Sequence, residues 1–544
     1  MSAMDETVTA HRDRFILDRL PPPHLRPEKI RDRPGLRLPP RLNAAQWLLM
    51  QGREKSGDGP AVTAPAGAWS YSEIVAAVDR MARRLVEGFG IVPGNRVLLA
   101  GANSPALLVA ILAGLKAGAV VVPALPLLRA RELAAILRTA RPQLALADAA
   151  VTATLEAACR RAAQAVPIVA LEDPTAPPAS DRAGGGEFTA CETATEDPAL
   201  ILFSSGTTGR PKAAVHGHGD IVSIVRTFGR HIFRGRAGDV VAGTPSLAFA
   251  YGFGALLSFP LAAGAAVHLD PAARAADLVE TARMAGASML VTAPTAYRRL
   301  LAEDGPFDLP RLRRCFSAGE RLPPAVAAAW RERTGVPIVD LLGSTEMLGP
   351  YVSAPEEAQR PGTIGRAVPG YELRLLDQGG RPVPSGSLGR LAVRGPTGCL
   401  LLDVDDQARA VREGWTLTGD ICRLDADGYV HYESRLDGII VSAGYNIAAG
   451  EVEEALASHP AVADCAVIGV SDPERGRAVV ALVVPGTDVA PSAALAETLR
   501  AHVKATIAPY KAPRRIHFLE ALPKTATGKI RRRDLAALVD EDVE

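Results

Sequence analysis

The sequence predicts an α/β protein with a large N-terminal domain of mainly parallel sheets flanked by helices and a small, mobile C-terminal α+β domain. Short, uninterrupted apolar runs alternate with helical patterns over the first 430 or so residues. Such runs are typical of strands that helices cover on both faces of a parallel sheet. Beyond residue 438 the pattern of strands and helices becomes smaller in scale. The length of 544 residues also exceeds what one hydrophobic core usually holds.

The elements follow in order along the chain. Residues 19–43 are rich in Pro and Arg and are expected to form an extended arm ahead of the fold. The run RVLLAG (96–101) predicts a strand, and the Asn-Ser-Pro that follows predicts a helix start, with Gly118 as the stop. Further strands are predicted at 119–124, 144–149, 199–203, 239–244 and 289–294. Ligands of such sheets bind at the carboxyl ends of the strands.

The last hundred residues form a separate unit in this interpretation. A helix over 449–458 precedes strand-like runs at 463–470 and 478–486. A second helix over 493–507 and a final run at 515–523 complete it. This length is within the usual range for a domain.

Composition and charge argue against several classes of protein. The net charge of +1 gives no electrostatic reason to expect nucleic acid or an anionic membrane as the main partner. Six cysteines lie far apart without a Cys-x-x-Cys pair, which fits a reducing compartment and not a zinc cluster. The N-terminal residues carry acidic side chains and no apolar core. We therefore expect a cytoplasmic protein without a signal peptide.

A loop rich in Gly and hydroxyl groups follows the strand predicted at 199–203. Glycine lets the backbone approach an anion closely, and consecutive N–H groups can form an anion-binding nest. The spacing does not match a Walker A loop, which excludes a P-loop NTPase. A mobile Ser/Gly turn is the alternative that composition alone leaves open. The loop comprises Ser204, Ser205, Gly206, Thr207, Thr208, Gly209 and Lys212.

The string SSGTTGRPK resembles the phosphate loop of the adenylate-forming acyl-CoA synthetase superfamily. The resemblance implies ATP, Mg²⁺ and CoA as cofactors or co-substrates. In the run LLGSTEM (341–347) it implies that Thr345 contacts the α-phosphate and that Glu346 is the metal ligand, which suits a hard cation. Leu342 stands where most relatives have an aromatic residue beside the adenine. The other ATP-binding residues implied are Ser317, Ala318, Gly319, Glu320, Asp340, Gly343, Ser344, Asp420 and Arg435.

The same resemblance divides the chain into an N-terminal domain at 1–434, a hinge at 435–437 and a C-terminal domain at 438–544. It implies that Asp437 is the hinge residue and that Lys529, in a Thr-Gly-Lys run, is catalytic together with Thr345 and Glu346. Lys524 is the competing lysine. The implied CoA-binding residues are Ser442, Ala443, Gly444 and Tyr445.

Aromatic residues separated by glycine predict a compact, flat pocket for the acid instead of a long acyl tunnel. Runs such as PTAYR, SAGE and SAGYNIAAGEVE resemble benzoate-type ligases, and most of all 2-aminobenzoate–CoA ligases. The expected reaction joins an aryl acid to CoA through an acyl-adenylate. The expected substrate-binding residues are Phe249, Ala250, Tyr251, Phe253, Gly254 and Gly343, with burial in the core as the alternative for Phe249.

Two other functions stay open at this point. One is an aryl acid–AMP ligase that loads the phosphopantetheine of a separate carrier protein. The other is a non-catalytic sensor of an acyl group or nucleotide, although a sensor has no need to keep Lys529, Glu346 and Asp420 together. The partners expected are an aryl acid and CoA, with neither nucleic acid nor membrane, and a homodimer is an open assembly state. No acidic or Cys partner stands at metal-ligand spacing from His216 and His218, so both are expected to be structural.

Overall fold

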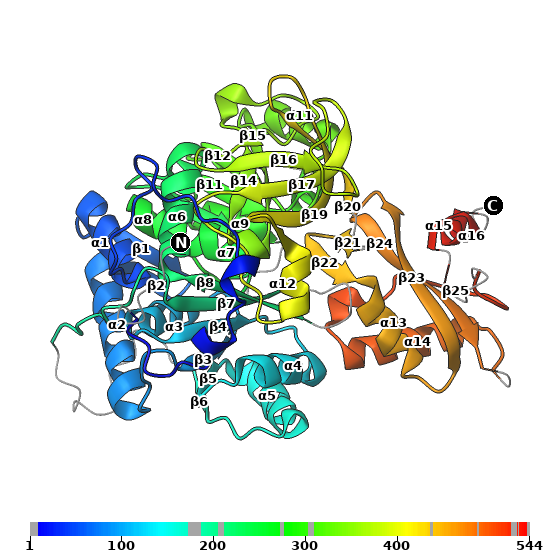
Figure 1. Cartoon of the computed structure of the whole chain (residues 1–544), viewed down its shortest axis with the longest axis horizontal. Helices are drawn as coiled ribbons and strands as arrows, with labels where there is room; N and C mark the ends of the chain where they lie inside the picture. The colour runs from blue at the N-terminus through cyan, green and yellow to red at the C-terminus, as the bar shows by residue number, and fades with distance from the viewer. Residues whose placement is uncertain are drawn as a thin grey trace.

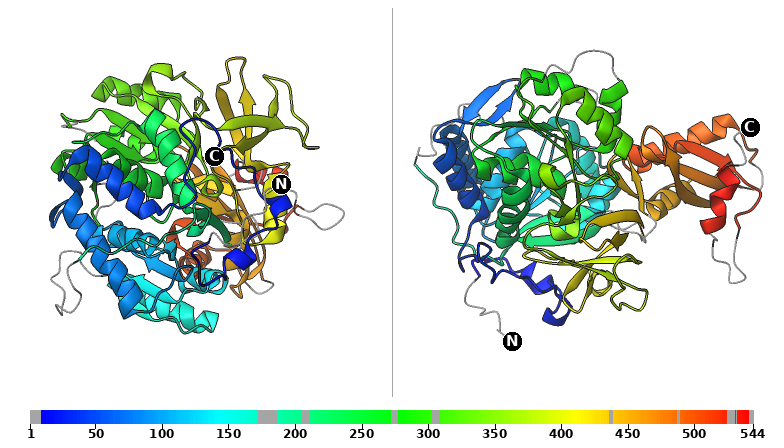
Figure 2. Two further views of the ribbon diagram at one scale, coloured as in Figure 1. Left: turned by 60° about the vertical axis from the view of Figure 1, so that its left-hand side comes forward. Right: turned by 90° about the horizontal axis from the view of Figure 1, so that it is seen from above.

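The computed structural model describes residues 9–171, 186–204, 211–271, 277–302, 309–435, 439–486, 489–523, 530 and 532–540. A large body carries three sheets, and a smaller lobe that begins at β21 lies against one side of it (Figure 1). The lobe projects from the body in the right-hand view of Figure 2. None of the described helices has the length and hydropathy needed to span a membrane.

The first sheet has the strand order β6-β5-β3-β4-β7-β8 and is parallel except for the β7–β8 pair. Its buried residues alternate between two cores: Val97 and Leu99 belong to one hydrophobic cluster, Leu98 and Ala100 to the other. Both faces are therefore covered, as predicted. The strands are β3 (Arg96–Ala100), β4 (Val120–Ala124), β5 (Leu144–Ala147), β6 (Ile168–Ala170), β7 (Pro198–Ser204) and β8 (Lys212–Gly217).

The helix predicted between Asn-Ser-Pro and Gly118 is present as α3 (Pro105–Lys116), close to its predicted bounds. Ser104 caps α3 by accepting a hydrogen bond from the backbone N–H of Leu107 at 3.1 Å. Pro105 occupies the first helical position, where it needs no donor. The other helices of the first half are α1 (Ala44–Ser56), α2 (Tyr71–Arg83), α4 (Ala130–Ala140), α5 (Ala149–Ala162), α6 (His218–Ile224), α7 (Ala250–Phe253) and α8 (Phe259–Ala263).

The second sheet has the order β15-β14-β13-β12-β11-β9-β10-β1-β2, with parallel pairing from β13 to β1. Its strands are β1 (Pro60–Ala64), β2 (Gly67–Ser70), β9 (Val240–Gly243), β10 (Ala266–His268), β11 (Met289–Thr292), β12 (Arg314–Ser317), β13 (Ile338–Gly343), β14 (Pro350–Ser353) and β15 (Arg366–Ala367). Helices α9 (Leu278–Met284), α10 (Pro294–Ala302) and α11 (Pro324–Thr334) connect the central strands.

The third sheet is wholly antiparallel, whereas the sequence predicted mainly parallel sheets. Residues 372–435 form it: β17 pairs with β16 and β19, and β19 also pairs with β18 and β20, each time antiparallel. The elements are β16 (Glu372–Leu376), β17 (Leu388–Arg394), α12 (Val404–Ala410), β18 (Val411–Arg412), β19 (Trp415–Leu424) and β20 (Val430–Arg435). The sheet lies at the top right of the body in Figure 1.

The smaller lobe contains the hairpin β21 (Ile439–Ser442) and β22 (Tyr445–Ala448), and the sheet β23 (Val462–Asp472), β24 (Gly476–Pro485) and β25 (Arg515–Phe518). Its helices are α13 (Ala449–Ala457), α14 (Ala493–Thr506), α15 (Arg532–Leu535) and α16 (Ala537–Asp540). The hairpin is next to the body, whereas α15 and α16 are at the far end of the lobe (Figures 1 and 2).

Candidate active site between the body and the lobe

One cavity of about 1580 Å³ lies between the body and the lobe and is open to solvent. Strands of both parallel-rich sheets end at it, and residues at or near these ends supply its wall: Ser204 at the end of β7, Thr244 after β9, Thr292 at the end of β11 and Leu342 in β13. This is the edge at which ligands bind to sheets of this type. The lobe contributes residues of the β21–β22 hairpin to the opposite wall.

Two of the predicted nucleotide motifs meet at this cavity. Residues Thr345–Met347 form a single 3₁₀ turn directly after β13, and Thr345 lines the cavity. The Oγ of Ser204, at the start of the predicted phosphate loop, donates to Oε1 of Glu346 at 3.4 Å. Glu346 itself does not line the cavity. The fold therefore brings together motifs that are 142 residues apart in the sequence.

The oxygen groups at this corner fit Mg²⁺ that enters with a nucleotide. Ser204, Thr345 and Glu346 offer two hydroxyls and one carboxylate, all hard donors. Across the described part of the chain, no cluster of three or more His, Cys, Asp or Glu side chains could hold a metal ion by itself. Mg²⁺ in nucleotide sites typically takes one or two carboxylates and fills its remaining positions with phosphate oxygens and water.

Asp340 lies in β13 and lines the same cavity. Burial raises the pKa of this carboxyl to about 8, although the backbone N–H of Leu341 donates to it at 3.1 Å. Asp340 is therefore mostly protonated at neutral pH in the ligand-free protein. Leu342, two residues further, is half-buried and presents an aliphatic surface to the cavity.

Asp420 reaches the cavity from the antiparallel sheet. It is almost completely buried in β19 and lines the cavity wall. In β20 its cross-strand neighbour is Arg435. The two residues predicted to contact the nucleotide are therefore paired by strand register, although the structure describes only the backbone of Arg435.

Only part of the predicted adenine turn, residues 317–320, lies at the cavity. Ser317 is buried at the end of β12 and does not line the cavity, whereas Ala318, Gly319 and Glu320 do. Glu320 accepts hydrogen bonds from Oγ1 of Thr295, at 2.8 and 3.1 Å, and from the backbone N–H of Gly444 in the lobe. Burial raises the pKa of Glu320, and these donors oppose the shift. Glu320 thus joins the body to the lobe, which the sequence did not indicate.

The β21–β22 hairpin closes the cavity from the lobe. Ala443 and Gly444 have φ angles of 49° and 82°, the left-handed pair required by a tight hairpin turn. Ala443, Gly444 and Tyr445 line the cavity, and Ser442 is buried behind them. The Tyr445 ring stacks on Tyr510 at 4.1 Å between centroids and meets the edge of Phe249 at 6.3 Å.

The predicted acid pocket is only partly at the cavity. Phe249, Ala250, Tyr251 and Gly343 line it, and the Tyr251 hydroxyl donates to the carbonyl of Thr292 at 3.4 Å. Phe253 does not line it, because the turn of α7 directs this side chain into the core, where it is fully buried. Gly254 is also away from the cavity and would place a Cβ only 2.9 Å from the Phe259 ring.

Several cavity residues were not predicted. Thr244 and Thr292 share a hydrogen bond of 2.6 Å, and Asn103 holds the 245–247 loop by donating to Pro245 O and accepting from Leu247 N. The sequence signal that could have identified these residues is a polar residue at or just after the end of each predicted parallel strand. Tyr510 and Lys511 also line the cavity, without a local signal of this kind.

Some predicted residues lie outside the described part of the chain: Ser205, Gly206, Thr207, Thr208, Gly209, Asp437, Lys524 and Lys529. Lys212 is described and does not line the cavity. Its Nζ lies 3.5 Å from Oδ1 of Asp406 in α12. His216 and His218 both bond to backbone groups, Nε2 of His216 to Thr345 O at 2.9 Å and Nδ1 of His218 to Ala44 N at 3.1 Å.

Comparison with known proteins agrees with this geometry. Residues 50–400 match the AMP-binding enzyme family, and residues 451–529 match the AMP-binding enzyme C-terminal domain. The chain belongs to the AMP-binding enzyme family. Among relatives in this family, a benzoate–CoA ligase of Thauera aromatica is 34% identical over 513 residues, which cover 92% of this chain and 96% of the relative.

Two solved AMP-binding enzymes show the same fold. The anthranilate CoA ligase AuaEII, in complex with anthranoyl-AMP, is 31% identical, with a TM-score of 0.71 over 94% of this chain and 100% of that one. The amide bond synthetase McbA from Marinactinospora thermotolerans is 27% identical, with a TM-score of 0.82 over 91% and 99% of the two chains. The protein is an AMP-forming acid–thiol ligase of the acyl- and aryl-CoA ligase group.

Proposed function

We propose that the protein activates an aryl carboxylate, 2-aminobenzoate or benzoate, with ATP and transfers the acyl group to CoA. The observation that carries this proposal is the single cavity in which an aromatic wall, the Thr345–Glu346 turn and the lobe hairpin meet. Phe249 and Tyr251 on this wall suit a flat ring. The aromatic acids named for the benzoate and anthranilate ligases support the same substrate class.

The chemistry has two steps. A carboxylate oxygen attacks the α-phosphorus of ATP, which forms the aryl-adenylate and releases pyrophosphate. The CoA thiol then loses its proton and attacks the acyl carbon, and AMP leaves. Because the first step joins two anions, positioning and charge neutralisation dominate its barrier.

We assign the roles to this chain's own residues. The 204–212 loop and Thr345 hold phosphate oxygens, Glu346 holds Mg²⁺, and Asp420 with Arg435 binds the ribose. Bound Mg²⁺ supplies positive charge to the phosphates. Ala318, Gly319, Asp340 and Leu342 border the adenine. Residues 443–445 guide the CoA thiol, and Asp437 is the hinge about which the lobe turns.

The decisive experiment measures AMP release from a panel of aryl carboxylates with ATP, in the presence and absence of CoA. We expect the fastest CoA-dependent turnover with 2-aminobenzoate or benzoate. Pyrophosphate exchange without CoA-dependent product identifies a different acceptor, such as a carrier-protein thiol or an amine. Absence of pyrophosphate exchange with every acid rejects the proposal and favours a sensor.

Replacement of the proposed catalytic lysine separates the two steps. Lys529→Ala should lower adenylation about 10²–10³-fold, which is typical for loss of one preorganised charge donor. Thioester formation from supplied aryl-adenylate should stay within about threefold, since Lys529 has no role in that step. Lys524→Ala, a lysine five residues earlier, is the matched control and should leave both steps intact. Equal loss of both steps in Lys529→Ala would contradict the assignment.

A further inference from the structure

We propose that Lys29 and Arg31 of the N-terminal arm are positioning residues for the nucleotide site, acting through Asp220, His216 and Thr397 on the turn that carries Thr345 and Glu346. The proposal rests on the function proposed above, because it assigns the phosphate and Mg²⁺ contacts to that turn. It gives the arm, which is far from the turn in sequence, an indirect part in catalysis.

The arm is attached to the body at the level of this turn. The backbone N–H of Ile30 donates to Gly395 O at 2.8 Å, and that of Glu28 donates to Gly414 O at 2.9 Å. At two glycines that face the arm, the packing is too close for a side chain. A Cβ on Gly398 would lie 2.4 Å from Cγ of Pro27, and one on Gly219 would lie 2.6 Å from an Arg31 nitrogen.

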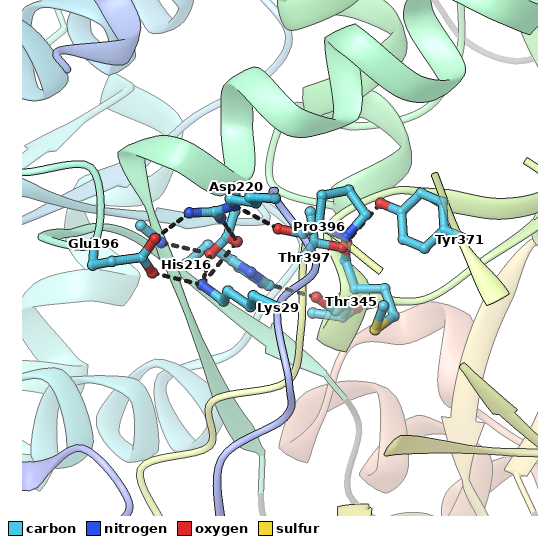
Figure 3. A network of polar contacts seen from close by, with 11 residues as sticks. Lys29, Glu196, His216, Asp220, Thr345, Tyr371, Pro396 and Thr397 are labelled. Carbon is cyan, nitrogen blue, oxygen red and sulfur yellow. Dashed lines mark hydrogen bonds and ion pairs between the residues drawn. The ribbon is translucent and has the colours of Figure 1, made fainter. Parts of the chain in front are cut away.

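Both cations of the arm converge on one buried carboxylate (Figure 3). The Asp220 side chain is fully buried, and its carboxylate accepts from Lys29 Nζ at 3.0 Å and from Arg31 at 2.6 Å. The same two cations also bind Glu196, which is 42% exposed. An unpaired buried carboxylate is costly, so Asp220 depends on the arm for its charge balance.

The first route from the arm to the turn passes through His216. Asp220 accepts from the backbone N–H of Gly217 at 2.9 Å, directly after His216 at the end of β8. Nε2 of His216 lies 2.9 Å from the carbonyl oxygen of Thr345. Burial lowers the pKa of His216 to about 4. The ring is therefore neutral, and its one N–H is on Nε2, because a carbonyl can only accept.

The second route passes through residues 396 and 397. Nε of Arg31 donates to Pro396 O at 2.8 Å. Oγ1 of the neighbouring Thr397 donates to Met347 O at 2.9 Å, and it accepts from the Tyr371 hydroxyl at 2.9 Å. The carbonyls of Thr345 and Met347, at the two ends of the three-residue turn, are thus held separately, and Arg31 contacts both routes.

The arrangement fixes Glu346 between two anchored carbonyls. A displacement of about 1 Å at a reacting group can lower a rate by about two orders of magnitude. A partial loosening of the turn should therefore lower the rate of adenylation, with little change in how the acid is bound.

The test compares Arg31→Lys with Arg33→Lys. The first keeps the charge but cannot reach Asp220 and Pro396 O together. The second alters an arm arginine that binds Glu372, which retains Arg394 as a partner. We expect Arg31→Lys to lower kcat of acid-dependent pyrophosphate exchange about tenfold, with the KM of the acid within about twofold. Amide hydrogen exchange over 341–350 should be at least about threefold faster, and Arg33→Lys should change neither quantity.

A second pair of variants tests the same contacts without altering the arm, so that a change in the stability of the arm cannot explain the result. Thr397→Val keeps the side-chain shape and loses the hydroxyl, whereas Thr397→Ser keeps the hydroxyl. Valine should reproduce the Arg31→Lys effects, and serine should restore values near wild type. Folded Arg31→Lys and Thr397→Val variants with unchanged amide exchange over 341–350, or with unchanged kcat, overturn the proposal. If the wild type lacks pyrophosphate exchange, the function proposed above fails, and amide exchange still decides whether the arm orders the turn.

Discussion

Asp340 is the residue whose protonation should be visible in the stability of the ligand-free protein. Its pKa of about 8 lies well above that of an Asp in the unfolded chain, because burial penalises the charged form. The folded protein thus holds a proton that the unfolded chain releases near pH 4. The free energy of unfolding should therefore fall as the pH rises from about 4 to about 8.

Asp340→Asn removes this contribution. We expect the loss of unfolding free energy between pH 5 and pH 8 to be smaller in the variant by at least about 1 kcal/mol, as measured by urea titration at both values. Ser344→Ala, which removes no ionisable group between β13 and the neighbouring turn, is the control and should keep the wild-type dependence. An identical pH slope for Asp340→Asn and wild type would show that Asp340 is ionised at neutral pH.

At the scale of elements, the β21–β22 hairpin should matter for the second step of the reaction. Gly444 has φ of 82°, donates to Glu320, and would place a Cβ 3.1 Å from that of Ala293. Gly444→Ala should move the hairpin away from the body and lower the rate of CoA thioester formation about tenfold, with pyrophosphate exchange unchanged. Gly428 has φ of 80°, and a Cβ added there would have no neighbour within 4 Å.

Gly428→Ala is therefore a control that imposes similar backbone strain, about 1–2 kcal/mol, without the contact to the body. Its thioester formation should stay within about twofold of wild type. The comparison is made with supplied aryl-adenylate, so that only the second step is measured. Similar rates for the two glycine variants would indicate that strain alone, and not the approach of the hairpin, accounts for the loss.

At the scale of the whole molecule, one buried ion cluster holds the lobe against the body. Lys511 of the lobe lies 2.5 Å from Glu132 in α4 and 2.6 Å from Glu451 in α13. All three side chains are buried. Glu132→Ala removes the contact between the two units and the N-cap hydrogen bond that Glu132 accepts from Arg129 N at 2.9 Å, whereas Lys511 keeps Glu451. We expect this arrangement of the lobe to lose about 2–5 kcal/mol and thioester formation to fall about tenfold.

Small-angle X-ray scattering should show a broader distribution of overall dimensions for Glu132→Ala than for wild type. Glu454→Ala breaks the more exposed pair with Arg131 at the same interface, and exposed pairs contribute little. The Glu454→Ala variant should have the scattering profile of the wild type, and its rate of thioester formation should stay within about twofold. Unchanged scattering and rate in Glu132→Ala would mean that other contacts between the two units, such as that of Tyr445 in the lobe with Phe249 in the body, suffice to hold the lobe.

The sequence by itself determined the elements whose signals are local. The apolar run at 96–101, the Ser104–Pro105 cap and the helices near 449–458 and 493–507 each depend on neighbours within a few residues. Motif order and resemblance also placed Ser204, Thr345 and Asp420 together before their geometry was known. Local periodicity and motif content survive without knowledge of the rest of the chain.

Only the tertiary structure decided which face each side chain presents and which distant partner it meets. Phe249 and Phe253 belong to one aromatic run, yet the first lines the cavity and the second is in the core. The antiparallel third sheet and the contact between Lys29 and Asp220, 191 residues apart, have no local pattern either. Long-range packing sets these contacts, because a buried charge or a turn takes its partner from whichever segment the fold brings beside it.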